Sequence, residues 1–241
     1  MQQASPLPMD PLLRDDVEAE ILHRNVRQVL STLEVNRYKD QAPARLIAVT
    51  KTVTPRVINQ LKPLQILDIG ENRAQVALPK LEEIAPEFRL HWIGRLQTNK
   101  VKYIIDKVCM LHTLDRLPLA QEVNRRAGEH ERLLPTLVQV NIAGESQKGG
   151  MPPEEVLPFL RQMKDFSNIR IQGLMSIMPL HADESQLRQL FAGMRRLFDQ
   201  LRETAVDGVE MQELSMGMSG DYAIAASEGA TMVRVGTALY R

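Results

Sequence analysis

The sequence predicts a single (β/α)8 barrel, and three observations lead to this fold class. The chain has 241 residues, which is within the usual size of one α/β barrel domain. Eight short runs rich in Val, Ile and Leu alternate with amphipathic helical patterns, as expected for parallel strands joined by helices. The chain also ends within a few residues of the eighth run. An open doubly wound sheet is the competing architecture, but closure of eight strands leaves no exposed edge, which favours the barrel.

The first part of the chain predicts a leader followed by a long helix. Residues 1–11 contain three prolines and almost no apolar pattern, so we expect a flexible leader there. Apolar residues then recur at helical spacing and predict an N-terminal helix over residues 12–38, with an apolar face that packs on the barrel. We expect residues 12–241 to form one domain that includes this helix. Its apolar face consists of Leu13, Val17, Ile21, Val26, Val29 and Leu33.

The eight apolar runs predict the strands of the barrel. In order, they cover residues 46–50, 65–69, 90–93, 108–113, 136–142, 169–175, 211–215 and 231–235. The clearest helical pattern between them covers residues 187–201 and places its apolar residues on one face, as a helix covering a sheet requires. The weakest covers residues 153–164, where we expect Pro158 to kink the helix or to delay its start.

Charge, hydropathy and cysteine content exclude several classes of function. The 30 basic and 30 acidic residues cancel, so the chain has no bulk attraction to nucleic acid or to an anionic membrane. No uncharged run is long enough to span a bilayer, and the first residues lack the features of an export signal. The single cysteine, Cys109, cannot form an internal disulfide, so we expect a cytoplasmic protein. The five histidines lack metal-ligand spacing, so we predict no metal site.

Small residues follow the predicted strands seven and eight. In barrels, the loops after these two strands frequently bind phosphate. Gly217 and Gly220 permit close approach of the backbone to a ligand, and Ser219 between them offers a hydroxyl. Gly236 and Thr237 supply a second glycine and hydroxyl after strand eight. Ordinary turn and cap chemistry explains either loop alone, but the two loops together predict a phosphate cup.

Two basic residues lie at the ends of other predicted strands. Lys51 follows the uncharged run LIAVT, so we expect its amine to point into the barrel mouth. Burial would lower the pKa of this amine and favour the neutral nucleophile that forms a Schiff base with an aldehyde. Arg234 lies in an otherwise apolar strand and pairs either with a carboxylate such as Asp221 or Glu228, or with a pyridine nitrogen. Its permanent charge would keep that nitrogen unprotonated, and an unprotonated ring is a poor electron sink.

Six stretches of the sequence together cover nearly all of the chain from residue 45 to its end. They are AVTKTV around Lys51, DIGENRAQ from Asp68, HWIGRLQTNK from His91, VNIAGESQKGG from Val140, GLMSIMP from Gly173, and LSMGMSGDYAIAASEGATMVRVGTALY from Leu214 to Tyr240. In this combination the chain resembles the pyridoxal 5′-phosphate (PLP) homeostasis family, and within it the cyanobacterial members. Two features depart from the family pattern: Arg95 stands where many members have histidine, and the leader is longer than usual.

The resemblance implies a fold, a cofactor and a set of site residues. The fold is that of the N-terminal domain of alanine racemase, which is fold type III of the vitamin B6 proteins. The cofactor is PLP, held as an internal aldimine on Lys51. The resemblance assigns the cofactor phosphate to one group of residues, the ring nitrogen to an arginine, and the pocket lining to two more. These are, in that order, Ser219, Gly220, Gly236 and Thr237; Arg234; and Asn72 and Met175.

Two classes of function agree with these residues. The preferred one is a non-catalytic protein that holds PLP on Lys51 and buffers the intracellular supply of vitamin B6. The resemblance implies other B6 vitamers and PLP-dependent apoenzymes as partners, and a monomeric state. The alternative is an enzyme that uses the same lysine, either an aldolase or isomerase on a phosphorylated carbonyl substrate or a weak single-domain amino-acid racemase. We prefer the first because a two-base racemase needs a second acid/base from an additional domain, which we do not expect in this chain.

Overall fold

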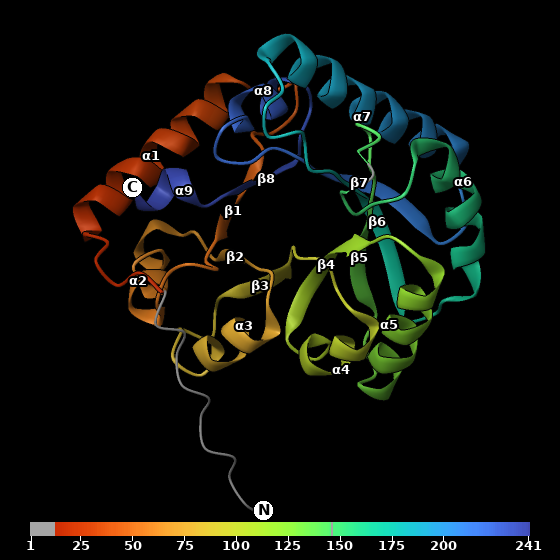
Figure 1. The fold of residues 1–241 in the computed structure, drawn as a ribbon, viewed down its shortest axis with the longest axis horizontal. Helices are drawn as coiled ribbons and strands as arrows, with labels where there is room; N and C mark the ends of the chain where they lie inside the picture. Colours follow the sequence, from red (N-terminus) through yellow and green to blue (C-terminus); the bar gives the residue numbers. More distant parts are fainter. Residues whose placement is uncertain (1–12, 146) are drawn as a thin grey trace, which may run out of the picture.

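The eight strands form one closed parallel barrel in the computed structural model, which describes residues 13–145 and 147–241 (Figure 1). Each strand pairs with its neighbours in sequence, and β8 pairs with β1 to close the barrel. This closure confirms the predicted fold class and excludes the open sheet. The strands are β1 (Arg45–Val49), β2 (Asp68–Glu71), β3 (Arg89–Trp92), β4 (Val108–Leu114), β5 (Leu134–Gln139), β6 (Ile169–Met175), β7 (Val209–Ser215) and β8 (Met232–Val235).

Helices surround the barrel on its outside, as Figure 1 shows. The α-helices are α1 (Ala19–Val35), α2 (Pro55–Asn59), α3 (Ala74–Leu81), α4 (Val101–Ile104), α5 (Leu117–Glu129), α6 (Pro153–Gln162), α7 (Glu184–Thr204), α8 (Tyr222–Ser227) and α9 (Thr237–Tyr240). Short 3₁₀ helices precede or follow three of them: η1 (Lys62–Leu64), η2 (Thr98–Lys100) and η3 (Met163–Asp165). Within the described residues, no helix has the length and apolar character needed to cross a membrane.

The N-terminal helix is shorter than the predicted helix over residues 12–38. Helix α1 begins at Ala19, because the chain before it is extended and Arg14 pairs in parallel with Val53. The Arg14 N–H donates to the carbonyl of Thr52 at 2.8 Å, so the backbone there bonds to the loop after β1 rather than to a helix. The buried face of α1 packs against α8 and α9, as expected for a helix that covers the barrel. The predicted leader lies outside the described residues.

Two strands differ from the predicted runs at their ends. The run at 65–69 becomes a strand only from Asp68, because Gln65 adopts a left-handed conformation with φ of 59° at the end of η1. A residue in that conformation cannot continue an extended strand. The run at 136–142 begins earlier, at Leu134, and ends at Gln139, after which Val140 pairs with Met151. Local turns therefore set both boundaries.

The two helical patterns that the sequence singles out both form helices. Helix α7 begins after Asp183, whose carboxylate accepts a hydrogen bond from the Gln186 N–H at 2.8 Å in a capping box. Helix α6 begins at Pro153 and continues through Pro158 to Gln162, so Pro158 does not delay its start. A proline inside a helix removes one backbone hydrogen bond. Here the burial of the apolar face of α6 stabilises the helix despite this loss.

The barrel interior is filled by one apolar layer and a set of polar side chains. Gly173 of β6 lies so close to β7 that a Cβ atom there would lie 1.8 Å from the carbonyl oxygen of Glu213, so only glycine fits. The larger apolar core lies between the strands and the surrounding helices. The apolar layer inside the barrel consists of Ile47, Met110, Leu137, Met175 and Met232. Buried polar residues of the barrel strands also lie in the interior, and several of them belong to the candidate site.

Candidate functional site

The loops after β7 and β8 are joined by hydrogen bonds, and we call residues 215–221 and 236–238 the double loop. The Ser219 Oγ atom accepts from the backbone N–H groups of Gly236 at 3.1 Å and of Ala238 at 3.2 Å. Among the described residues, the N–H groups of Ser219, Gly220 and Thr237 have no hydrogen-bond acceptor. Phosphate-binding loops present backbone N–H groups of this kind to the anion. The structure therefore brings together the four residues that the sequence places in a phosphate cup, and their role stays a prediction.

Three glycines determine how closely the double loop approaches its neighbours. Gly217 has a φ of 92°, and a Cβ atom there would lie 2.5 Å from the Cβ of Ala225 in α8. A Cβ on Gly236 would lie 3.2 Å from the Cβ of Val49, so the double loop contacts the end of β1. Nothing lies within 4 Å of a Cβ built on Gly220, so there is open space above this residue. The double loop is thus packed on one side and open on the other.

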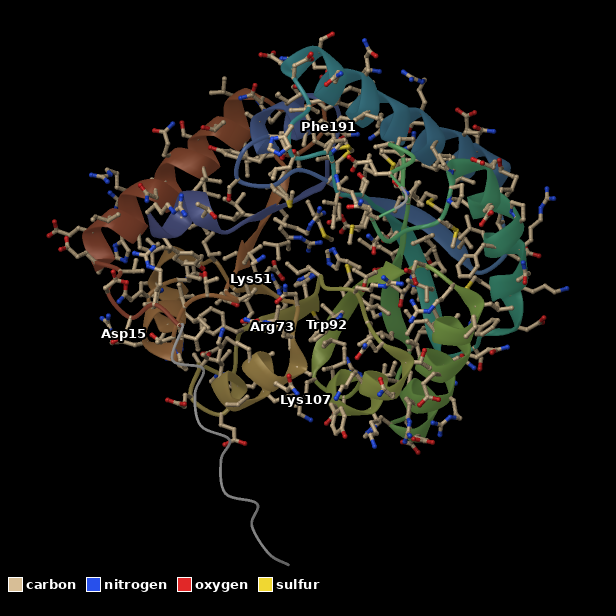
Figure 2. The ribbon with its side chains drawn as sticks, in the orientation of Figure 1. Asp15, Lys51, Arg73, Trp92, Lys107 and Phe191 are labelled. Atoms are coloured by element: carbon tan, nitrogen blue, oxygen red, sulfur yellow. The ribbon has the colours of Figure 1, made fainter. Side chains whose placement is uncertain are left out.

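Lys51 lies just beyond the end of β1, inside the ring of helices in Figure 2. Thr50 before it is buried, whereas the Lys51 side chain is exposed to solvent. The expected burial of the Lys51 amine is therefore wrong. Lys51 lies two residues beyond Val49, the last residue of β1, and is exposed, so its amine is accessible from the barrel mouth. Because Val49 contacts Gly236, the lysine and the double loop belong to the same end of the barrel.

A buried ion pair supports the backbone next to Lys51. The Lys80 ammonium group, on α3, donates to the Glu71 carboxylate at 2.9 Å and to the carbonyl oxygen of Thr50 at 2.8 Å. The Thr50 hydroxyl donates to the same Glu71 oxygen at 2.8 Å. Both charged side chains are only 2% exposed. Lys80 is not among the site residues predicted from the sequence. The signal that could have found it is a lysine on the apolar face of a helical pattern, with Val76 and Ala77.

Arg234 lies inside the barrel and is 4% exposed. Its Nη1 donates to the hydroxyl of Ser215 at 2.7 Å and its Nη2 to the carbonyl oxygen of Ser176 at 2.7 Å. Burial lowers the pKa of Arg234 to about 10, and the charge of Asp221 acts in the opposite direction, so the guanidinium stays cationic at neutral pH. Of the two carboxylates considered from the sequence, neither is hydrogen-bonded to it; Glu228 pairs with Arg188.

Asn72 and Met175 occupy different parts of the barrel. Met175 is the last residue of β6 and is fully buried in the interior apolar layer. Asn72 follows β2 and packs so tightly on Gly94 that a Cβ there would lie 2.5 Å from the Cβ of Asn72. Its Oδ1 atom is buried and has no hydrogen-bond partner among the described residues. Asn72 and the exposed Arg95 also line a groove of about 940 Å³ between α3 and η2.

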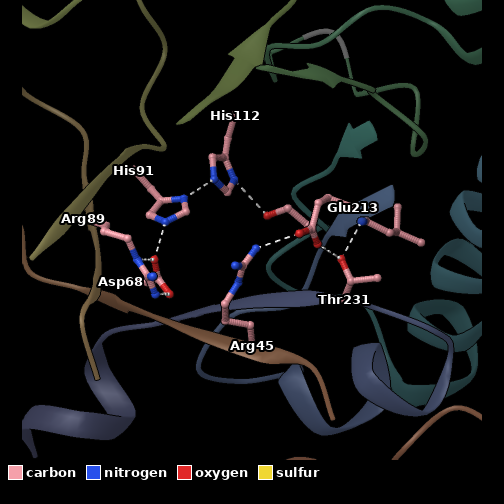
Figure 3. A network of polar contacts seen from close by, with 9 residues as sticks. Arg45, Asp68, Arg89, His91, His112, Glu213 and Thr231 are labelled. Atoms are coloured by element: carbon pink, nitrogen blue, oxygen red, sulfur yellow. Dashed lines mark hydrogen bonds and ion pairs between the residues drawn. The ribbon is translucent and has the colours of Figure 1, made fainter. Parts of the chain in front are cut away.

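A chain of hydrogen bonds crosses the barrel interior and ends at Arg234. Figure 3 shows its part from Asp68 to His112. Asp68 of β2 contacts His91 of β3, which contacts His112 of β4, and His112 contacts Ser215 of β7. With Arg234 of β8, the five side chains are buried polar or charged groups from five different strands. From the sequence, the histidines were candidates only for metal ligands, and this chain was not predicted. Barrel closure brings these strands together, so spacing along the sequence could not reveal it.

The single cysteine is not activated as a nucleophile, and no metal site is found among the described residues. The thiol of Cys109 is partly buried beside Asp68, and burial, together with the Asp68 charge, raises its pKa to about 12. A thiol with such a pKa is protonated at neutral pH and is a poor nucleophile. Within residues 13–145 and 147–241, no group of three or more His, Cys, Asp or Glu side chains is arranged to hold a metal ion.

Comparison with known proteins gives the family. Residues 20–241 match the family described as alanine racemase, N-terminal domain. The chain is 40% identical over 198 residues to a "Pyridoxal phosphate homeostasis protein" of Aquifex aeolicus, covering 82% of this chain and 86% of that protein. It is 36% identical over 198 residues to the protein of the same name from Synechocystis sp., covering 81% and 90% of the two chains. The chain belongs to the pyridoxal phosphate homeostasis protein family.

Solved structures agree with this family and its fold. PipY of Synechococcus elongatus, determined with PLP bound, matches with a TM-score of 0.81 and 30% identity, over 91% of this chain and all of that chain (100%). The structure of PipY without PLP matches with a TM-score of 0.83 and 31% identity. Alanine racemase from Bartonella henselae matches with a TM-score of 0.72 at 13% identity, over 93% of this chain and 57% of that chain, which shows the fold alone. The predicted family resemblance and type III barrel are confirmed.

Proposed function

We propose that this protein binds PLP at the barrel mouth and takes part in its homeostasis as a non-catalytic holder. The observation that carries the proposal is the double loop, whose N–H groups without an acceptor lie at the same end of the barrel as the exposed amine of Lys51. The family relatives named for PLP homeostasis, and the PipY structure with PLP bound, support the choice of cofactor.

The residues fit PLP by their chemistry. Bound PLP would supply an aldehyde, a phosphate and a pyridine ring. Ser219, Gly220, Gly236 and Thr237 would hold the phosphate, because their backbone groups border the open space of the double loop. The Lys51 amine would form a covalent bond with the aldehyde. An arginine carries five N–H donors, and Arg234 uses one N–H from each of two nitrogens inside the barrel, so it has others for the ring nitrogen.

Two further residues complete the proposed pocket. The Asn72 Oδ1 atom has no partner among the described residues and would meet a polar group at the mouth. Met175 would form part of the apolar floor, because it belongs to the layer directly inside the barrel.

The charge of Arg234 supports the proposed non-catalytic role. The guanidinium stays cationic at neutral pH, so it does not transfer a proton to the ring nitrogen of bound PLP. It can only donate a hydrogen bond to that nitrogen, which would therefore stay unprotonated. An unprotonated ring withdraws electrons poorly, which disfavours the carbanion chemistry of most PLP enzymes. The names of the homeostasis relatives support the same role. Transfer of PLP to apoenzymes, binding of other B6 vitamers, a monomeric state and a cytoplasmic location remain predictions.

Titration with PLP tests the proposal. We expect the wild-type protein to gain a visible absorption band, and borohydride reduction followed by mass spectrometry to find the label on Lys51. Lys51→Ala should lose the band but keep weaker binding through the double loop. Lys107→Ala is the matched control. Lys107 is an exposed lysine that directly precedes β4, away from the ends of the strands that carry Lys51 and the double loop, and it is ion-paired with Asp106 (Figure 2).

Two results would contradict the proposal. A wild-type protein that gains no band with PLP does not use it as proposed, and turnover of a phosphorylated carbonyl substrate by that protein would support the aldolase or isomerase alternative. Racemisation of alanine well above the rate of free PLP, lost in Lys51→Ala, would show a catalytic role instead of a holding one.

A further inference from the structure

The hydrogen-bonded chain inside the barrel connects a carboxylate at one end to a guanidinium at the other. The Asp68 Oδ1 and His91 Nε2 atoms are 2.9 Å apart, His91 Nδ1 and His112 Nε2 are 2.9 Å apart, and His112 Nδ1 and Ser215 Oγ are 3.0 Å apart. Arg234 Nη1 then donates to Ser215 Oγ at 2.7 Å. At its outer end, Asp68 also accepts two hydrogen bonds from Arg89, at 2.8 and 2.7 Å. Figure 3 shows the part of the chain from Arg89 and Asp68 through His91 to His112.

With one proton on each histidine ring, the two ends of the chain determine the direction of every hydrogen bond between them. An ionised carboxylate only accepts and a guanidinium only donates. His91 must therefore donate from Nε2 to Asp68, which leaves Nδ1 of a neutral His91 as an acceptor. His112 then donates from Nε2 to His91, and its Nδ1 accepts from the Ser215 hydroxyl. Ser215 presents its lone pairs to Arg234, and each donor in the chain points toward Asp68.

Burial and charge favour this single arrangement. His112 is 0% exposed, and its burial, together with the nearby positive charges of Arg234 and Arg45, lowers its pKa well below the usual value, so its ring is neutral. Asp68 keeps a pKa of about 2, because the hydrogen bonds from His91 and Arg89 outweigh the effect of its burial. The other charged or titratable groups that face the chain are Arg45 of β1, Glu213 of β7, which pairs with Arg45, Cys109 of β4, and Asp221 beside Arg234.

We infer that Asp68, His91, His112 and Ser215 are positioning residues that orient Arg234 toward the ring nitrogen of bound PLP. This inference rests on the proposed function. Ser215 and the Ser176 carbonyl each hold one N–H of the guanidinium, so the plane of Arg234 is defined by two contacts inside the barrel. Its remaining N–H groups then keep a defined direction. Asp68 acts at a distance, because it holds His91, which holds His112, and His112 in turn fixes the position of the Ser215 hydroxyl that accepts from Arg234.

Nitrogen NMR of the histidine side chains tests the chain without PLP. In the wild-type protein at pH 7, we expect His91 and His112 each to carry one proton, on Nε2. A His112 ring protonated on Nδ1, or a charged His91 ring, would overturn the inference, whether or not PLP binds. This measurement needs no substitution, so it does not depend on the folding of any variant.

Substitution at Ser215 tests the effect on PLP. Ser215→Ala removes one buried hydrogen bond to a charged group, so we expect roughly tenfold weaker PLP binding and a shifted visible band. Ser215→Thr keeps the hydroxyl and should restore the wild-type band, which a role in packing alone would not explain. Ser31→Ala, at an exposed serine of α1, is the control. If the wild type binds PLP and Ser215→Ala gives the same band and affinity, the inference is wrong; if the wild type binds no PLP, the proposed function fails instead.

Discussion

Lys80 is the residue that most directly connects the fold to the barrel mouth. Its ammonium group is buried, and it contacts both the Glu71 carboxylate and the backbone of Thr50, which precedes Lys51. Burial of a charge is costly, and the cost is offset only while its partner and hydrogen bonds are in place. The carboxylate and the lysine thus fix the end of β1 and with it the position from which Lys51 leaves the strand.

Removal of the Lys80 charge should therefore destabilise the protein. Lys80→Met leaves the Glu71 carboxylate buried without its ion-pair partner, and we expect the free energy of unfolding to fall by about 3–5 kcal/mol. Urea denaturation measures this change. Lys62→Met is the control, because Lys62 forms an exposed ion pair with Glu87 at 2.8 Å and should leave the unfolding midpoint nearly unchanged. Equal effects of the two substitutions would contradict a structural role for the buried pair.

The elements that matter most for the site are the connections after β7 and β8. Each is short, and each holds its conformation by contacts with a neighbouring element: Gly217 with Ala225 of α8, and Gly236 with Val49 of β1. Helix α9, which follows, is fixed to α1 by Asn25, whose Nδ2 donates to the carbonyl oxygens of Leu239 at 3.1 Å and Arg241 at 2.7 Å. The N-terminal helix thus supports the double loop indirectly, through the last helix of the chain.

A pair of glycine substitutions separates crowding from backbone strain. Gly217 and Gly208 both have positive φ, of 92° and 76°, but only at Gly217 would a Cβ atom meet a neighbour, at 2.5 Å. Gly217→Ala should lower the free energy of unfolding by about 3 kcal/mol and weaken PLP binding, because strain and a steric clash add. Gly208→Ala should cost about 1 kcal/mol, from strain alone, and leave PLP binding unchanged. Urea denaturation and PLP titration measure both; equal losses in stability would contradict the clash.

The molecule as a whole places titratable groups where only a closed barrel could shield them. His112 is neutral in the folded state and Asp68 is ionised, and both have a lowered pKa. In each case the unfolded chain binds a proton more readily than the folded one as the pH falls. By linkage, stability must then decrease with decreasing pH.

We expect two separate losses of stability on acidification. The first begins below about pH 6.5, where the unfolded chain protonates His112 and the folded protein does not. The second, of about 2 kcal/mol, occurs between the ordinary pKa of 3.8 and the folded value of about 2 for Asp68. Urea denaturation at a series of pH values measures both. His112→Gln should flatten the curve between pH 7 and 5, and substitution of the exposed His181 by Gln should not; parallel curves for all three proteins would contradict the assignment.

Much of the fold and part of the candidate site could be predicted because their signals are local. Eight apolar runs of strand length alternate with helical patterns, and this alternation leads to a parallel barrel whatever the exact boundaries. The positions of Lys51 and of the double loop then follow, since each lies within a few residues of the end of a strand. The start of β2 was predicted too early because the left-handed conformation of Gln65 depends on a turn that apolar patterning does not reveal.

By itself, then, the sequence determined the order of strands and helices, the loops that carry the small residues, and the family. Only the tertiary structure decided that Lys51 is exposed, that Lys80 is buried against Glu71, and that Asp68 reaches Arg234 through two histidines and a serine. The physical reason is distance along the chain. Burial and hydrogen bonding depend on which strands become neighbours when the barrel closes. Asp68 lies on β2 and Arg234 on β8, far apart along the chain, so only closure of the barrel connects them.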